Sequence, residues 1–238
     1  MTLESILIDP SQAREVEPGL WSVLDEGDVG APYDNRAAAY DRAVSNPSYL
    51  RIAWGLTRHD NQRFIDDAFR SRRDGWIADI AAGTCVDSAA TYADTRRPTV
   101  VLDRSLDMLR RGRERLVEHA ESVPSNVVFL QADAYALPFR CDAISTVLCH
   151  GAYHVFHETE QLTREWQSAL APDGQVFVSS LVRGRWIGDR YLGLLRRTGE
   201  IAPPRTAEEF RQRAESELGR PLDLEAVGNF AYARTSPA

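Results

Sequence analysis

Short apolar runs alternate with longer amphipathic segments through the middle of the chain, and this alternation constrains the fold more than any other feature. The amphipathic segments have helical spacing: residues 105–123 place Leu106, Leu109 and Leu116 near one face, and Ser105 is able to cap the helix. Helical crossovers between consecutive strands imply parallel pairing, with helices on both faces of the sheet. The runs that predict these strands are residues 76–81, 99–103, 126–131, 143–149 and 175–181.

Two further apolar runs close the chain, at residues 222–227 and 229–234. Little more than Gly228 separates them, which predicts an antiparallel hairpin. The expected fold is therefore α/β. It is a Rossmann-like sheet of seven strands, mostly parallel, with helices on both faces and a C-terminal antiparallel hairpin.

The segments that flank the parallel strands are suited to cover the ligand edge of such a sheet. Residues 1–75 are helical in pattern and form a predicted N-terminal cap, and residues 76–182 form the predicted ligand-binding core. Residues 183–238 supply an excursion on the substrate side together with the last two strands of the same domain. A length of 238 residues suits one globular domain with such accessory elements.

Charge and composition exclude several classes of partner. Asp and Glu number 35 against 28 Lys and Arg, for a formal net charge of −7, so no overall field attracts nucleic acid. The N-terminus lacks the pattern of a secretory signal and no 18-residue apolar stretch occurs, so we expect a cytoplasmic protein without a membrane partner. Three cysteines without C-x-x-C spacing predict neither a disulfide framework nor a metal site. We expect a monomer or a homodimer.

The turn after the first predicted strand is the most informative loop. In a doubly wound sheet this turn presents backbone N–H groups and a helix N-terminus to the ligand. A dinucleotide site requires G-x-G-x-x-G here, because glycine lets the pyrophosphate approach the backbone. The turn reads DIAAGTC, residues 79–85, and only Gly83 is a glycine. Dinucleotide binding is therefore disfavoured, and a ligand without phosphates is expected.

Taken in order, the motifs resemble those of the class I S-adenosylmethionine-dependent methyltransferases that act on small molecules. DIAAGTC stands where the family has D-x-G-x-G-x-G, and Asp103 in VVLDRSLDML is similar to the acidic residue that ends the second strand. Asp133 in LQADAYALPF is similar to the acidic position after the third strand. VLCHGAYHVFHE, APDGQVFVS and the lead-in YDNRAAAYD resemble further family segments. The resemblance implies S-adenosylmethionine as cofactor and S-adenosylhomocysteine as product.

The resemblance also implies a role for the matching positions. Asp103 would accept hydrogen bonds from the ribose hydroxyls, Asp133 from the adenine amino group, and Asp79 would neutralise the ammonium of the methionine moiety. Plainer interpretations stay open, with Asp103 as an acid at a helix N-terminus and Met108 as ordinary core. The implied cofactor site consists of Asp79, Ala81, Gly83, Asp103, Arg104, Met108, Asp133, Ala134 and His150.

Cys85 adds bulk where the family has the last glycine of this motif. The thiol could pack between strand and helix as a small hydrophobe, the cofactor could shift, or the site could have lost methyl transfer. We adopt the first interpretation. The last corresponds to alternative functions, in which the same fold binds the cofactor but catalyses a non-methylating reaction such as cyclisation, or senses the cofactor as a regulator.

Methyl transfer depends chiefly on holding the acceptor in line with an already electrophilic sulfonium. An oxygen acceptor must also lose a proton, and His150 and His154 are the candidate bases; either could instead shape the cofactor site or fix a loop. The predicted reaction is methyl transfer to an oxygen of an aromatic or polyketide-like metabolite of secondary metabolism. Residues expected on the acceptor side are Tyr33, Tyr40, His154, Trp186 and Tyr191.

Overall fold

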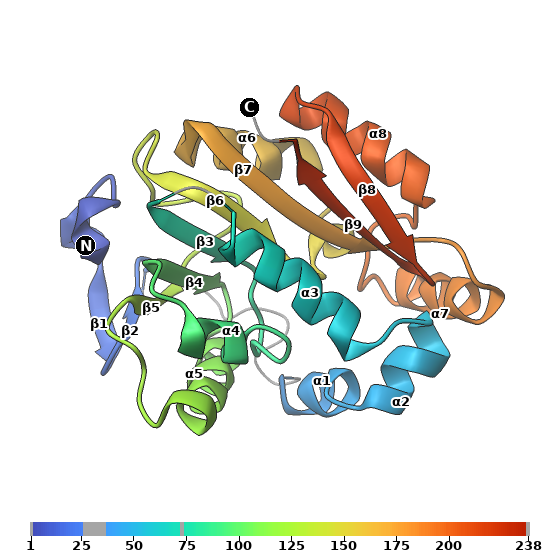
Figure 1. Ribbon diagram of the computed structural model, residues 1–238, viewed down its shortest axis with the longest axis horizontal. Coiled ribbons are helices and arrows are strands. Elements are labelled where there is room, and N and C mark those ends of the chain that lie inside the picture. Colours follow the sequence, from blue (N-terminus) through green and yellow to red (C-terminus); the bar gives the residue numbers. More distant parts are fainter. Residues whose placement is uncertain (1, 26–36, 72–73, 237–238) are drawn as a thin grey trace.

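A computed structural model describes residues 2–25, 37–71 and 74–236, and the nine strands in these residues form one sheet (Figure 1). The strand order is β1-β2-β5-β4-β3-β6-β7-β9-β8. The strands are β1 Arg14–Glu17, β2 Leu20–Ser22, β3 Trp76–Ile80, β4 Thr99–Asp103, β5 Val127–Gln131, β6 Ile144–Cys149, β7 Leu170–Leu181, β8 Leu222–Val227 and β9 Phe230–Thr235.

The seven predicted strands and their directions are confirmed. Strands β3 to β7 pair in parallel, and β9 pairs antiparallel with both β7 and β8. The main difference in extent is β7, which begins at Leu170, five residues before the predicted start. The parallel strands follow the sequence pattern because both of their faces are buried, which makes each strand a nearly continuous apolar run.

The helical pattern expected throughout residues 1–75 is wrong for the segment that forms β1 and β2. These strands make a hairpin, and β2 adds to the sheet parallel to β5, with Trp21 opposite Leu130. Gly19 has a φ of 74° in the tight turn between them, and Leu20 is fully buried against the sheet. A strand of three residues is too short to show an alternating pattern, so only tertiary pairing identifies it.

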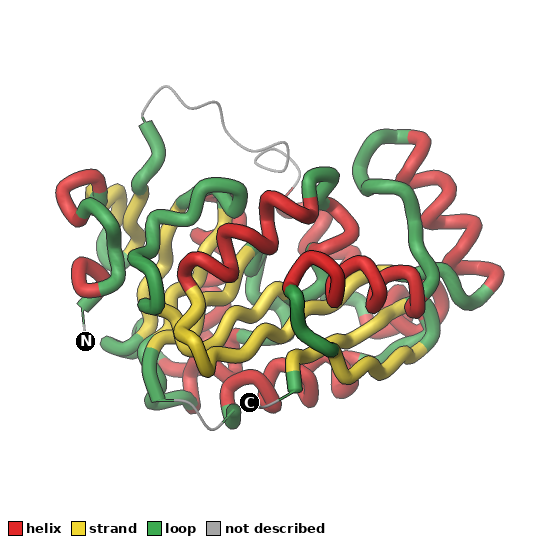
Figure 2. The backbone as a smooth tube through the Cα atoms, turned by 90° about the horizontal axis from the view of Figure 1, so that it is seen from above, coloured by secondary structure: helices red, strands yellow, loops and turns green. Residues whose placement is uncertain are grey.

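The longer helices cover both faces of the sheet, each with its own core cluster (Figures 1 and 2). Buried side chains of α3, α4 and α5 belong to one cluster, and those of α6 and α8 belong to the other. Ser105 caps α5 as predicted, because its hydroxyl accepts a 3.2 Å hydrogen bond from the Met108 N–H. The helices are α1 Ala37–Val44, α2 Pro47–Tyr49, α3 Arg58–Phe69, α4 Ala89–Asp94, α5 Leu106–Ala120, α6 Thr159–Ala169, α7 Trp186–Arg197 and α8 Ala207–Leu218, with the π-helical turn η3 Leu50–Trp54 and the 3-10 turns η1 Leu3–Ser5, η2 Pro10–Gln12 and η4 Tyr153–Val155.

Two segments far apart in the sequence meet beside the ends of the parallel strands. Turn η3 packs against α7, which follows the carboxyl end of β7, and both lie at the lower right of Figure 1. The rings of Trp54 and Tyr191 are 5.2 Å apart, and the Asn229 N–H donates a 2.7 Å hydrogen bond to the Trp54 carbonyl. Within the described residues, no helix is both long enough and apolar enough to cross a membrane.

Candidate active site

The turn after β3 adopts a left-handed backbone conformation at every second residue. The φ angles of Ala81, Gly83 and Cys85 are 57°, 59° and 54°. Only glycine adopts this region without cost, so the geometry explains why the family motif repeats glycine at this interval. Ala81 and Cys85 each carry a strain of about 1–2 kcal/mol that glycine would avoid.

Cys85 points away from the ligand edge and into the packing between the turn and α5. Its side chain is 1% exposed and belongs to the core cluster of α3, α4 and α5. The sulfur lies where Gly112 of α5 leaves room, because a Cβ on Gly112 would be 2.6 Å from Sγ. Burial, with a contribution from nearby Asp79 and Asp103, raises the pKa of the thiol far above its usual value. The interpretation of Cys85 as a small packed hydrophobe is confirmed, and the thiol is protonated at neutral pH.

Asp79 has a buried carboxylate oxygen without a hydrogen-bond partner among the described residues. The side chain is 2% exposed, the Tyr92 hydroxyl donates to Oδ2, and Oδ1 has no hydrogen-bond partner within the described residues. Burial raises the pKa of Asp79 to about 7, although the Tyr92 hydrogen bond and the charge of His150 oppose it. An unpartnered buried carboxylate oxygen is costly, and a cationic ligand group would satisfy it.

The space in front of the turn is open at Gly83. A Cβ built on Gly83 would meet no described atom within 4 Å. Its N–H donates a 2.9 Å hydrogen bond to Asp103 Oδ2 at the end of β4, and Asp103 Oδ1 accepts a 2.9 Å bond from the Ser105 N–H. Asp103 therefore joins the turn to the start of α5, as an acid at a helix N-terminus does, while lying at the ligand edge of the sheet.

Arg104 and Asp133 form an ion pair beyond the ends of β4 and β5. The other oxygen of Asp133 accepts a 2.9 Å hydrogen bond from the Tyr135 N–H, and the side chains of Arg104 and Asp133 are 36% and 28% exposed. Met108 and Ala134 are nearly buried, at 4% and 7% exposure. The edge thus offers a partly exposed acid, which suits the amino group of an adenine ring.

His150 is held by a hydrogen bond at Nδ1 and by ring contacts. Nδ1 lies 2.9 Å from the Ser179 hydroxyl, which itself accepts a 2.8 Å hydrogen bond from the Gly151 N–H. The Ser179 proton is therefore available to Nδ1, and Nε2 faces Asp87 Oδ2 at 3.8 Å. The ring stacks on Tyr232 at 6.4 Å with an interplanar angle of 12°. This arrangement fixes the orientation of the imidazole and turns Nε2 towards a carboxylate.

His154 is also fixed by the backbone. Its Nδ1 accepts a 3.2 Å hydrogen bond from the Leu181 N–H, and its carbonyl accepts a 2.9 Å bond from the Ala202 N–H. Burial lowers the pKa of His154 to about 4, so the ring is neutral at pH 7. Because Nδ1 accepts, Nε2 carries the ring proton and can donate to a ligand but cannot remove a proton from it.

Asp87 is a site residue that the sequence analysis missed. It is 9% exposed and accepts hydrogen bonds of 2.6 Å from Arg58 Nη1 and 2.7 Å from Asn61 Nδ2, both in α3. Burial alone would raise the pKa of Asp87, but His150, Arg58 and Asn61 together lower it. The Tyr232 hydroxyl extends this network by a 2.7 Å bond to Asn61 Oδ1. No local pattern distinguishes Asp87, since its partners lie 26 or more residues away along the chain.

Asp41, the last residue of the lead-in YDNRAAAYD, connects α1 to the glycine turn. It accepts a 2.6 Å hydrogen bond from the Thr84 hydroxyl and bonds of 2.9 and 3.0 Å from the Arg115 guanidinium. The ion pair is mostly shielded, with 17% of the Asp41 side chain and 19% of the Arg115 side chain exposed. The resemblance to the family lead-in was the available signal, but the sequence did not show what this aspartate contacts.

The residues expected on the acceptor side have different surroundings. Tyr33 lies outside the described residues, and so does the side chain of Tyr40, although its backbone belongs to α1. Tyr191 packs half-buried against the rings of Tyr49 and Trp54. Trp186, at the start of α7, is 70% exposed.

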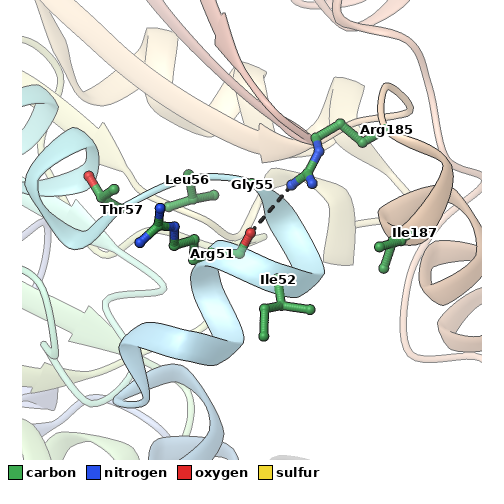
Figure 3. Close-up of a pocket in the computed structure, with 7 residues that line it drawn as sticks. All are labelled: Arg51, Ile52, Gly55, Leu56, Thr57, Arg185 and Ile187. Atoms are coloured by element: carbon green, nitrogen blue, oxygen red, sulfur yellow. Dashed lines mark hydrogen bonds between the residues drawn. The ribbon is translucent and has the colours of Figure 1, made fainter.

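A groove of about 560 Å³ lies between η3 and α7 (Figure 3). Arg185 crosses it from the α7 side and donates a 3.3 Å hydrogen bond to the Arg51 carbonyl. Ile52 and Ile187 supply apolar walls from the two elements. The groove therefore joins both covers of the sheet and combines cationic with apolar surface.

Comparison with known proteins finds methyltransferases among the proteins that this chain resembles. The family model for a methyltransferase domain matches residues 77–174. The chain is 34% identical over 181 residues to the ubiquinone/menaquinone biosynthesis C-methyltransferase UbiE of Ectopseudomonas mendocina. This match covers 71% of this chain and 67% of that protein. It is 29% identical over 157 residues to the UbiE protein of Hahella chejuensis, covering 64% of this chain and 59% of that protein. The chain thus spans less than two thirds of the length of the second relative.

A solved structure shows the same fold at low identity. The SAM-dependent methyltransferase from Aquifex aeolicus superposes with a TM-score of 0.58 at 13% identity, over 83% of this chain and 98% of that chain. The turn geometry, the sheet order and the curated relatives lead to one assignment. The chain belongs to the class I S-adenosylmethionine-dependent methyltransferase family.

Proposed function

We propose that this chain is an enzyme that transfers the methyl group of S-adenosylmethionine to a small-molecule acceptor. The observation that carries the proposal is the buried Oδ1 of Asp79, which has no hydrogen-bond partner among the described residues, in the strand that leads into the open turn at Gly83. A carboxylate in this setting needs a cation, and the ammonium of the cofactor is one. The family to which the chain belongs uses this cofactor.

The residues present fit the parts of the cofactor. Asp79 would bind the ammonium. Asp103 would accept hydrogen bonds from the ribose hydroxyls. Asp133 would accept one from the adenine amino group while it stays paired with Arg104. Met108 and Ala134 would contact the ring faces. The bound cofactor supplies an electrophilic methyl group, so the remaining task of the chain is to position an acceptor.

We propose that His150 and His154 shape the site and do not act as general bases. His150 pairs with the Ser179 hydroxyl through Nδ1, and its Nε2 lies 3.8 Å from the Asp87 carboxylate; His154 is neutral with its acceptor nitrogen bonded to the backbone. The acceptor would then be nucleophilic without a protein base, as an ionised phenol oxygen or an electron-rich ring carbon is. An aromatic acceptor of this kind agrees with the C-methyltransferase names of the relatives and leaves oxygen as the alternative target.

The position of Cys85 gives no support to the non-methylating alternative. It depended on Cys85 reaching the cofactor, but the thiol faces Gly112 of α5. Release of S-adenosylhomocysteine during turnover separates the two functions, because cyclisation would consume an acceptor without releasing it.

Calorimetric titration with S-adenosylmethionine and S-adenosylhomocysteine tests the cofactor site first. We expect wild-type dissociation constants of about 1 μM to 1 mM, a range typical of enzyme ligands, and loss of binding in Asp103→Ala. Asp107→Ala is the matched control, because Asp107 lies in the first turn of α5 and pairs with Arg110 on the surface. Absence of binding by folded wild-type protein would refute the proposal. A panel of electron-rich phenols, assayed for S-adenosylhomocysteine release, then tests transfer.

A further inference from the structure

Exposed apolar side chains concentrate on one small part of the molecule. Six large apolar side chains are exposed in the described residues, and four of them lie in η3 and α7. Isolated exposed apolar residues are ordinary, but a cluster marks an interaction surface. The four, with their exposed fractions, are Ile52 at 63%, Trp186 at 70%, Ile187 at 43% and Leu194 at 53%.

Helix α7 presents a mixed apolar and cationic face to solvent. At 100° per residue, positions 186, 187, 190, 194 and 197 fall within one narrow arc, and all five are exposed. The opposite face is buried, with Leu192 at 1% exposure. The Arg190 guanidinium lies 5.3 Å from the centre of the Trp186 ring, which keeps charge and indole side by side.

The charge of this face is opposite to that of the whole protein. Residues 185–197 contain four arginines and one acidic residue, whereas the chain carries a formal net charge of −7. The single acid, Asp189, faces inward and accepts 2.8 Å hydrogen bonds from the Gly184 N–H and Asn229 Nδ2. The outward charge of the segment is therefore positive.

The groove between η3 and α7 opens on the same side. Ile52 of η3 and Ile187 of α7 both line it, so exposed apolar residues of the two elements meet at the groove (Figure 3). Arg51 and Arg185 add two further cations at the groove. We call the set Ile52, Trp186, Ile187, Arg190, Leu194 and Arg197 the α7 surface.

We propose that the α7 surface docks peripherally on an anionic lipid bilayer. Tryptophan, isoleucine and leucine beside arginines form the combination that partitions into the interface of a bilayer, with apolar side chains among the acyl chains and guanidinium groups at the phosphates. The positive charge selects anionic lipid over a neutral surface. The proposal revises the expectation of no membrane partner, which considered only spanning segments and signal peptides.

Docking would bring the groove against the lipid. An apolar aromatic acceptor dissolved in the bilayer would then reach the two covers of the sheet directly, a consequence that rests on the proposed methyl transfer. The docking itself does not. Vesicle binding can be measured without cofactor or acceptor, so failure of docking and failure of methyl transfer are separate results.

Vesicle sedimentation tests the proposal with the full chain. We expect binding to phosphatidylcholine vesicles that contain phosphatidylglycerol to be at least about tenfold stronger than to phosphatidylcholine alone, and to weaken as salt rises. Trp186→Ser with Leu194→Ser should lower the partition coefficient at least about tenfold. Arg190→Gln with Arg197→Gln should lower it by a similar factor and remove most of the salt dependence.

Two control pairs match these variants in chemistry but lie off the α7 surface. Ile8→Ser with Val117→Ser removes the other two exposed apolar side chains, and Arg70→Gln with Arg96→Gln removes two exposed charges near the amino ends of β3 and β4. Both control pairs should bind like wild type. Equal loss in a control pair, or no preference for anionic vesicles, would overturn the proposal. So would a wild-type dimer that Trp186→Ser with Leu194→Ser converts to monomer, since the surface would then bind a second copy.

Discussion

Replacing Gly112 with alanine should change the stability of the protein in opposite directions, depending on residue 85. In the wild type the new Cβ would lie 2.6 Å from Cys85 Sγ, a contact that requires the turn or α5 to shift. Overpacking of this kind costs about 1–3 kcal/mol. Alanine in place of glycine inside a helix returns about 1 kcal/mol, so the net effect is a destabilisation of up to about 2 kcal/mol.

The same substitution should stabilise a Cys85→Gly background. Without the sulfur, the nearest described atom to the new Cβ is the Gly83 carbonyl oxygen, at an ordinary contact distance of 3.5 Å. The helix-propensity gain of about 1 kcal/mol then stands without the clash. The two residues should therefore couple by about 1–3 kcal/mol, the full size of the overpacking cost.

Urea unfolding followed by the fluorescence of the five tryptophans gives the four free energies of the cycle. Gly193→Ala in α7 is the control, because a Cβ there would meet nothing within 4 Å, and it should stabilise both backgrounds equally. If Gly112→Ala has the same effect in both backgrounds within about 0.5 kcal/mol, the packing argument for Cys85 is refuted.

Two further results are expected. The pKa of Asp79 is raised to about 7, so its carboxyl is protonated at pH 6 and must lose a proton to bind an ammonium. Cofactor affinity should therefore rise up to about tenfold per pH unit towards pH 7, and calorimetric titrations at pH 6 should release about one proton. Titrations of Asp79→Asn should release none. Asp41→Asn breaks a mostly shielded ion pair with Arg115 and should cost about 1–3 kcal/mol in urea unfolding, against less than about 1 kcal/mol for Asp107→Asn on the surface; equal costs would contradict the role of Asp41.

The stability of the folded chain should follow the same titration. The folded pKa of Asp79 exceeds its unfolded value of 3.8, so the folded state holds the proton more tightly. This contribution favours folding at acid pH and is lost as the pH rises from about 4 to about 7. The loss of this contribution is the stability cost of ionising the buried Asp79 carboxyl, which is the form that binds a cation.

The sequence was most informative where a residue's role depends on its own segment. Strands β4 and β8 have the predicted limits: β4 is an apolar run that ends at Asp103, and β8 ends at the turn residue Gly228. Asp79 and Asp103 lie at the carboxyl ends of β3 and β4 in a parallel sheet, whose carboxyl ends share one edge, so the approach of Asp103 to Gly83 was predictable.

The sequence was least informative where partners come from distant segments. Asp87 and Asp41 look like ordinary loop and helix acids until folding places Arg58, Asn61 and Arg115 beside them. These contacts span between 26 and 74 residues of chain. The partners of the two candidate histidines are also set by the fold. The Ser179 hydroxyl bonds to Nδ1 of His150, and the Leu181 N–H donates to Nδ1 of His154.

Sequence alone therefore determined the α/β sheet, the position of the glycine turn and the acids at the ends of the strands, because local periodicity and parallel topology suffice for these. Tertiary structure alone decided which way Cys85 points and which groups bond to the ring nitrogens of His150 and His154. It also decided that β1 and β2 extend the sheet and that Ile52 lies near Trp186, Ile187 and Leu194. Each of these depends on which side chains meet across the fold, and on how much water is excluded there. Burial and orientation are properties of the packed molecule, and no segment contains them by itself.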